Sequence, residues 1–225
     1  MTYTLTRSKR KTVALHICDG KIEVRAPLRM PKYAIDEFVA SKERWIKKHL
    51  TRSQQQVRNR DNFCLNYGDR IQILDESFVI TENNEWLCSS PLGQNNEIYM
   101  KSGMTPEQIK VACIDLCKLI ATGHLIFRTE ELAKKMSVSP NSIKISNAKS
   151  RWGSCSANKD ISYSWRLIMA DEDAVDYVIV HELAHLLEMN HSQRFWTIVE
   201  SVTPDYKDCK KRLKELQIKL ANENW

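Results

Sequence analysis

Alternating apolar residues mark the first part of the chain. Apolar and polar residues alternate over 12–17 and 21–26, with Asp19-Gly20 between the two runs. This period of two is typical of half-buried strands, and Asp-Gly is a hairpin signal. Short strand patterns follow at 70–74, 78–81, 85–88 and 97–100. An amphipathic helix is predicted over about 32–57, with Tyr33, Ile35, Phe38, Val39, Trp45, Ile46 and Leu50 as its apolar residues. We therefore predict a mainly β lobe with one long helix over residues 1–103.

The second part of the chain has mostly helical periodicity. Thr105-Pro106-Glu107-Gln108 predicts a capped helix start, and the apolar pattern behind it continues to Met136. Three short strand patterns at 143–145, 151–155 and 161–165 precede a helix that follows Asp171. Further helices are predicted at about 195–202 and 206–221. The predicted fold class is α+β, and the C-terminal lobe, 104–225, packs its helices on a small antiparallel sheet.

Charge is unevenly distributed along the 225 residues. The first sixty residues hold 15 Lys and Arg against 5 Asp and Glu, a net +10, while the whole chain has a net +6. Such asymmetry favours an anionic partner, either a nucleotide, a nucleic acid or an acidic protein surface. Solvated charged faces on a small lobe are the simpler interpretation of the same pattern.

Neither a membrane segment nor a disulfide framework is predicted. No stretch of eighteen apolar residues exists, and the N-terminus is polar and basic without an apolar core. The seven cysteines are scattered and form no C-x-x-C pair. Cys113 and Cys117 lie four apart among apolar neighbours, which favours core packing over metal binding. We expect a cytoplasmic protein with no membrane partner.

The strongest chemical signal is the run His181-Glu182-Leu183-Ala184-His185, followed by His191. On a helix, residues four apart share a face, so His181 and His185 can bind one ion while Glu182 points toward a water. Met189-Asn190 offers a left-handed turn that would bring His191 back as a third ligand. Catalytic zinc usually keeps three protein ligands and an open fourth position. We predict one Zn²⁺ on these histidines, with Glu182 as general base; a chance arrangement on a helix is the alternative.

Several motifs in the second half resemble the YgjP-like metallopeptidase family, which is related to SprT-like and gluzincin-type zinc peptidases. They are Arg151-Trp152-Gly153-Ser154-Cys155-Ser156, the run from Tyr177 to His185, Asn190-His191-Ser192 and Phe195-Trp196. The resemblance implies a zincin-like catalytic lobe, with the three histidines as ligands and Glu182 as base. Glu188 stands where metzincins have Gly, and no Met-turn string follows, so a metzincin is not favoured.

The resemblance also suggests substrate-binding residues. In gluzincin-like sites a strand beside the metal binds the substrate backbone, and the segment 151–155 is the candidate for it. Arg151 would hold an anionic group and Gly153 would permit close backbone approach. Tyr206 would bond an oxyanion, although packing is the more common role for such a tyrosine, and core packing explains Trp152 equally well. The predicted substrate-binding residues are Arg151, Trp152, Gly153, Ser154 and Tyr206.

Three functions follow from these observations. The first is a zinc-dependent metallopeptidase-like hydrolase acting on a peptide or protein. The second is a nucleoside triphosphate pyrophosphatase or phosphohydrolase at the same metal site, with the basic lobe neutralising the triphosphate. No glycine-rich phosphate loop supports it. The third is a nucleic-acid-associated protease module whose basic lobe docks on DNA or RNA.

Overall fold

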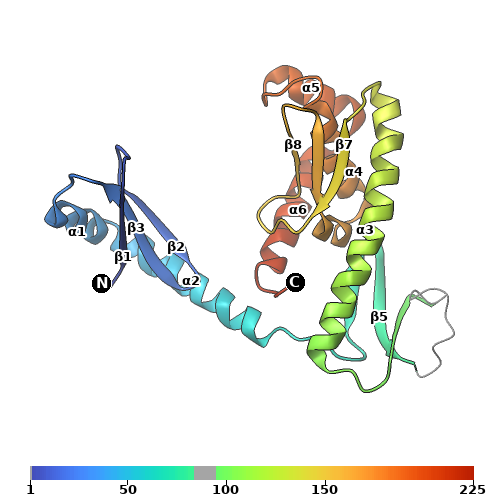
Figure 1. Ribbon diagram of the computed structural model, residues 1–225, viewed down its shortest axis with the longest axis horizontal. Helices are drawn as coiled ribbons and strands as arrows, with labels where there is room; N and C mark the ends of the chain where they lie inside the picture. Colours follow the sequence, from blue (N-terminus) through green and yellow to red (C-terminus); the bar gives the residue numbers. More distant parts are fainter. Residues whose placement is uncertain (1, 84–94) are drawn as a thin grey trace. The chain divides into compact units, whose positions relative to one another are not determined.

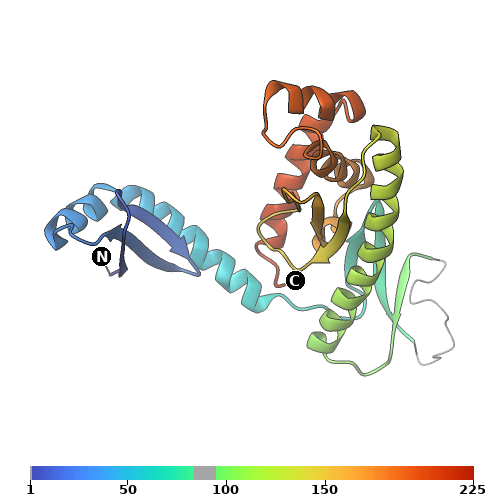
Figure 2. The ribbon, with the colours of Figure 1, turned by 45° about the horizontal axis from the view of Figure 1, so that its top comes forward.

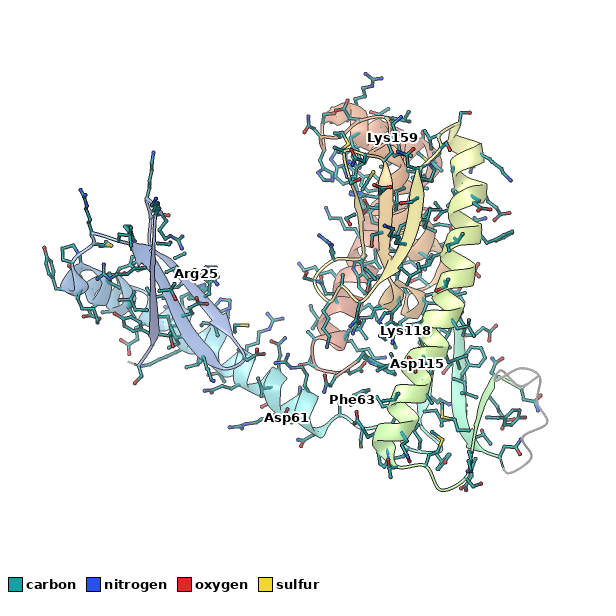
Figure 3. All side chains as sticks on the ribbon, viewed as in Figure 1. Arg25, Asp61, Phe63, Asp115, Lys118 and Lys159 are labelled. Carbon is teal, nitrogen blue, oxygen red and sulfur yellow. The ribbon has the colours of Figure 1, made fainter. Side chains whose placement is uncertain are left out.

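The computed structural model describes residues 2–83 and 95–225, which form two compact units (Figure 1). The first unit extends to Phe63 and includes Lys219–Asn224, and the second comprises Cys64–Ile218 with Trp225. Figure 3 labels Asp61 and Phe63 at the boundary. We expected the boundary after residue 103. It lies earlier because the segment after Phe63 packs on the second unit, where the Leu74 amide donates to the Ile168 carbonyl at 2.7 Å.

A three-stranded sheet forms the first unit's framework. Its strands are β1 (Thr4–Ser8), β2 (Ala14–Cys18) and β3 (Lys21–Pro27), in the order β1-β3-β2. The predicted hairpin is confirmed, since β2 and β3 pair antiparallel and Asp19 and Gly20 both have positive φ. The β1 strand was not predicted, because only one of its five residues is apolar.

Two helices, α1 (Lys32–Ser41) and α2 (Glu43–Asn62), pack against this sheet, so the prediction of one helix over about 32–57 is wrong. The break is at Lys42, where φ is −103° and ψ is 11°. Ile35, Val39 and Ile46 are buried as predicted, whereas Tyr33 and Trp45 are exposed. A helix turns about 100° per residue, so in α1 Tyr33 points away from the side of Ile35 and Val39, and in α2 Trp45 points away from the side of Ile46.

The second unit begins with another small sheet, made of β4 (Arg70–Ile73), β5 (Glu76–Glu82) and β6 (Glu97–Met100). The β4 and β5 strands pair antiparallel, and β5 and β6 pair parallel. The strand predicted at 85–88 lies outside the described residues.

The long helix α3 (Pro106–Met136) follows and is capped as predicted. The Gln108 amide donates to Thr105 Oγ1 at 3.3 Å, and the Thr105 amide donates to Gln108 Oε1 at 2.8 Å. Cys113 and Cys117 are fully buried on this helix, and burial raises the pKa of each thiol to about 12. Their predicted role as core residues is therefore confirmed.

A third sheet and three helices complete the second unit. Its strands are β7 (Ser142–Ser146), β8 (Gly153–Cys155) and β9 (Asp160–Ser164). A 3-10 helix, η1 (Trp165–Met169), comes directly after β9. The helices are α4 (Glu172–Ala184), α5 (Gln193–Val202) and α6 (Tyr206–Leu220). Helix α3 contacts η1, α4 and β7, and it runs beside β7 in both ribbon views (Figures 1 and 2).

The predicted α+β class is confirmed, but the expectation of a purely antiparallel sheet is wrong. The β7 strand pairs parallel with β9, and only the β8–β9 pair is antiparallel. The chain leaves β7, forms β8 at the far edge and returns through β9 in the middle, so β7 and β9 run the same way. No described helix is both long and apolar enough to cross a membrane.

Candidate metal centre

Helix α4 holds the H-E-x-x-H run in a fixed position. Its N-cap is Asp171, whose carboxylate accepts from the Ala174 amide at 2.9 Å and from Arg212 at 2.6 Å. Nearly every residue between these contacts and the histidines is buried, including Val175 and Ile179 at 0 % exposure. A helix packed on all sides cannot rotate, so the positions of His181 and Glu182 are set by the core.

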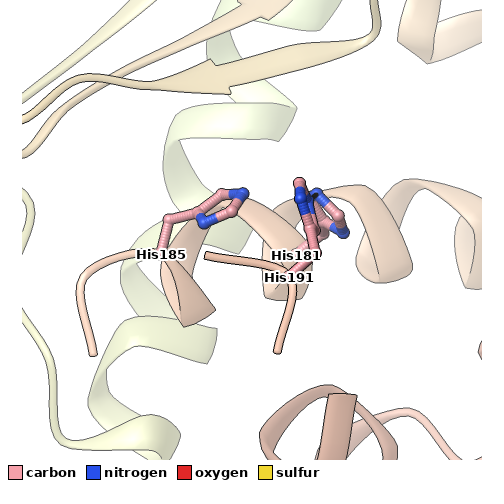
Figure 4. A group of neighbouring side chains, drawn as sticks. All are labelled: His181, His185 and His191. Carbon is pink, nitrogen blue, oxygen red and sulfur yellow. Dashed lines mark hydrogen bonds between the residues drawn. The ribbon is translucent and has the colours of Figure 1, made fainter. Parts of the chain in front are cut away.

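Three imidazoles converge at the C-terminal end of α4 (Figure 4). His181 lies in the last turn, His185 is the C-cap, and His191 precedes Ser192, the N-cap of α5. Their ligand atoms all lie within 4.8 Å of one another. The Nε2 atoms of His181 and His191 are 3.1 Å apart. Two nitrogens bound at about 2.0–2.1 Å to one tetrahedral ion lie about 3.3 Å apart. The pair therefore has the spacing that a shared ion requires.

The chain reaches His191 by a different turn from the one predicted. Asn190 does not have positive φ. The helix instead ends at Ala184, and tight turns continue through Leu187, whose amide donates to the Ala184 carbonyl at 3.0 Å. The Ser192 amide then donates to the Asn190 carbonyl at 2.8 Å. The earlier helix end leaves enough chain for His191 to return without a left-handed residue.

The environment of the imidazoles suits metal binding. Nδ1 of His185 lies 3.2 Å from the Glu188 carbonyl, which can only accept a hydrogen bond, so Nδ1 carries the proton. The unprotonated Nε2 then has its lone pair available for a metal ion. Burial, followed by the neighbouring imidazoles, lowers the pKa of His181 to about 3. Neutral imidazole is the form that binds metals. Nδ1 of His181 is buried and has no hydrogen-bond partner in the described part of the chain, so no hydrogen bond from this atom fixes the orientation of the ring.

Phe195 supports the cluster from α5. This ring is fully buried, and its centroid lies 4.9, 4.6 and 4.8 Å from those of His181, His185 and His191. Phe195-Trp196 was among the motifs of the family resemblance, but no role at the site was predicted for this ring. A helical aromatic is normally assigned to the core, and here the core and the site share one residue.

Glu182 lies next to the cluster, against the backbone of β8. Its side chain is 6 % exposed, and burial raises its pKa to about 7 against the opposing effect of Arg151. A Cβ atom added to Gly153 would lie 2.6 Å from Glu182 Oε1 and 2.7 Å from Cγ. Only glycine permits this approach. The close backbone contact predicted for Gly153 is therefore present, and the group that approaches is the Glu182 side chain.

The β8 strand offers an open edge. In the sheet order β7-β9-β8 it has one neighbour among the described strands. The Trp152 carbonyl accepts from the Ser164 amide at 2.8 Å, and the Ser156 amide donates to the Asp160 carbonyl at 2.9 Å. Main-chain groups alternate in direction along a strand, so those of Gly153 and Cys155 point away from β9.

The remaining predicted substrate residues have different surroundings. Arg151 is exposed, and its charge acts on Glu182. Trp152 lines a cavity beside Glu182, whereas Ser154 is half-buried opposite Ser162 in the sheet. The ring of Tyr206 stacks on those of Tyr177 and Trp196, with centroids 6.2 and 5.2 Å away, and Tyr206 is not among the residues that line the cavity.

The cavity beside Glu182 also has walls that sequence reasoning missed. Its volume is about 450 Å³, and α6 contributes four residues at helical spacing to its lining: Lys210, Leu213, Lys214 and Gln217. This spacing was visible in the sequence as an amphipathic pattern. Nothing in the sequence placed that face of α6 beside α4.

The family to which this chain is similar agrees with this geometry. The family model described as YgjP-like, metallopeptidase domain, matches residues 11–216. No curated protein matches the sequence. A solved structure, that of the metallopeptidase zymogen of Pyrococcus abyssi abylysin, is similar over 40% of this chain and 90% of its own, at 24% identity and a TM-score of 0.37. The family match spans most of the chain, and the chain therefore belongs to the YgjP-like metallopeptidase family, whose members are metal-dependent, metallopeptidase-like hydrolases.

Proposed function

We propose that the protein is a zinc-dependent metallopeptidase, in which His181, His185 and His191 hold one Zn²⁺ and Glu182 is the general base. The observation that carries this proposal is the convergence of three imidazoles beside a buried carboxylate at the end of α4. Imidazole suits zinc, and three protein ligands leave a position open for chemistry. When bound, the ion supplies Lewis acidity, which polarises the scissile carbonyl and makes a nearby water more acidic.

Glu182 has the properties of a proton acceptor at neutral pH. Burial raises its pKa to about 7 when no ion is bound, and a cation beside it would lower that pKa and so favour the ionised form that accepts a proton. Contact with Gly153 restricts where the carboxylate can lie. Glu182 takes a proton from the attacking water and passes it to the leaving amine of the peptide.

The open edge of β8 supports a peptide as the substrate. An extended peptide adds to such an edge through main-chain hydrogen bonds, which are independent of its side chains. The amide and carbonyl groups of Gly153 and Cys155 that point away from β9 lie along this edge, and Gly153 also contacts Glu182. A peptide paired with β8 therefore passes the base with its backbone held. Arg151 lies beside the same strand, where it binds anionic groups of the substrate.

The six described cysteines, which exclude Cys88, are free thiols. We infer a reducing cytoplasm from the sequence, in which the cysteines are an odd, scattered set without a C-x-x-C pair.

The test compares wild type with Glu182→Gln, both loaded with zinc and incubated with a mixed peptide pool. We expect wild type to produce fragments and Glu182→Gln to produce none, while the two bind equal amounts of zinc by elemental analysis. Glu188→Gln, close in sequence and outside the cavity, is the matched control and should cleave like wild type. Cleavage by Glu182→Gln at the wild-type rate would show that Glu182 is not the base.

A second function, docking on nucleic acid, is favoured by one observation in the first unit. Trp45 is 43 % exposed, and its ring lies 4.3 Å from that of His49. Lys48 and Arg52 lie on the same helical face and form no ion pair among the described residues, whereas Lys47 pairs with Glu43 at 2.7 Å. An exposed aromatic ring among cations is typical of single-strand binding surfaces.

The nucleic-acid function is tested by binding of a single-stranded oligonucleotide at several salt concentrations. Lys48→Glu with Arg52→Glu should weaken binding and flatten its salt dependence. Unchanged binding by this double variant would exclude the surface.

A further inference from the structure

The cavity beside Glu182 combines apolar walls with two lysines. Trp152, Val178 and Leu213 supply much of the apolar lining, and Lys210 and Lys214 enter from α6. His181 and Glu182 line the same space, so any group that fills it lies next to the reacting centre. The volume of about 450 Å³ falls within the range of small-ligand sites, about 300–1,000 Å³.

The charge of these two lysines is not neutralised within the described part of the chain. Neither Lys210 nor Lys214 forms an ion pair there. The contrast is Arg212 on the same helix, which contacts the carboxylates of Asp171, Asp173 and Asp208 at 2.6, 3.8 and 3.2 Å. Two lysines four residues apart repel each other on a helix. An anion between them would relieve that repulsion.

Lys210 is close to the histidine cluster as well as to the cavity. Its Nζ lies 5.3 Å from the centroid of the Trp196 ring, and the centroids of the Trp196 and His181 rings are 5.9 Å apart. The one carboxylate in the cavity lining is that of Glu182. The cavity thus has an excess of positive charge at the end that α6 forms.

We propose that this cavity is the subsite for an acidic residue of the substrate, an Asp or Glu beside the scissile bond. Lys210 and Lys214 bind its carboxylate, and Trp152 and Leu213 pack on its short apolar stem. This inference rests on the proposed function, because it places the subsite next to the proposed base. It adds a substrate preference that neither the histidine triad nor the strand edge determines.

The test measures binding, so that it does not depend on turnover. Two fluorescein-labelled octapeptide pools are prepared, identical except that every Glu of one is Gln in the other. Their dissociation constants are measured by anisotropy with the full-length, zinc-loaded Glu182→Gln protein. We expect the Glu pool to bind about 5- to 10-fold more tightly, the effect of two partly exposed ion pairs. The preference should shrink as salt is raised.

Variants on α6 assign the preference to the cavity. Lys210→Gln with Lys214→Gln should remove the difference between the pools and leave binding of the Gln pool unchanged. Lys211→Gln is the matched control, since Lys211 is exposed on the same helix and does not line the cavity. It should retain the full preference.

The outcomes separate this inference from the proposed function. Equal binding of the two pools, or a preference that survives the double substitution, overturns the acidic subsite even if wild type cleaves peptides. A lysine-dependent preference supports the subsite even if wild type cleaves none, and the proposed catalysis then fails alone. Lysine-dependent binding of a nucleoside triphosphate in place of either pool would overturn the peptide assignment and favour phosphoanhydride chemistry.

Discussion

Gly153→Ala is the substitution whose effect the structure determines most directly. The new Cβ would lie 2.6 Å from Glu182 Oε1, 2.7 Å from Cγ and 2.9 Å from Cδ. Ordinary contact begins at 3.4 Å, so the carboxylate must move by roughly 0.8 Å or the strand must yield. The backbone of Gly153 is not in the left-handed region, so alanine fits the local conformation and the strain falls on Glu182.

A shift of this size at the proposed general base should have a large effect on rate. Misplacing a catalytic group by about 1 Å lowers the rate by about 100-fold, which corresponds to about 2.7 kcal/mol of transition-state stabilisation. The cost in unfolding free energy should be about 1 kcal/mol, at the low end for overpacking, because a side chain moves and the backbone does not. The zinc content should not change, since Gly153 is not a ligand.

The assay is kcat/KM for a cleaved peptide, together with zinc content and the free energy of unfolding in urea. Gly123→Ala in α3 is the matched control, because nothing lies within 4 Å of its added Cβ. It should gain about 0.5–1 kcal/mol of stability without affecting the rate.

A double-mutant cycle separates positioning from other roles of Gly153. In a Glu182→Gln background, Gly153→Ala should cause no further loss of rate, because the group it displaces is already inactive. If Gly153→Ala alone kept the wild-type rate, Gly153 would not position Glu182. Independent, additive losses would show that Gly153 acts on the substrate and not through Glu182.

Three further predictions concern the site's support, its ligands and the core thiols. Asp171→Ala removes the α4 cap and a partner of Arg212, so urea denaturation should show a loss of about 1–2 kcal/mol; an unchanged midpoint would contradict the capping role. Zinc at a hundred times its dissociation constant should stabilise wild type by about 2.7 kcal/mol but not His191→Ala, and equal stabilisation would remove His191 from the ligand set. Iodoacetamide at pH 8 should modify Cys18 and Cys64 in the native protein and spare Cys113 and Cys117, whose pKa values burial raises to about 12; equal rates would exclude core positions.

The local features of this protein follow from its sequence alone. The four-residue spacing of His181 and His185 places both on one helical face, whatever the rest of the fold does. The cap at Thr105 and the hairpin at Asp19-Gly20 were predictable for the same reason, since each depends on neighbours a few residues away. Amphipathic patterns located most of the helices and strands, although they placed Tyr33 and Trp45 on the wrong face.

Which distant segments meet depends on the tertiary structure. It set Gly153 against Glu182, brought the lysine face of α6 to the same cavity, and paired β7 with β9 in parallel. It also assigned the segment after Phe63 to the second unit. Spacing along the chain fixes geometry within a few turns of helix or a hairpin. Contacts between remote segments depend instead on how whole faces pack, which the order of residues in one segment does not contain.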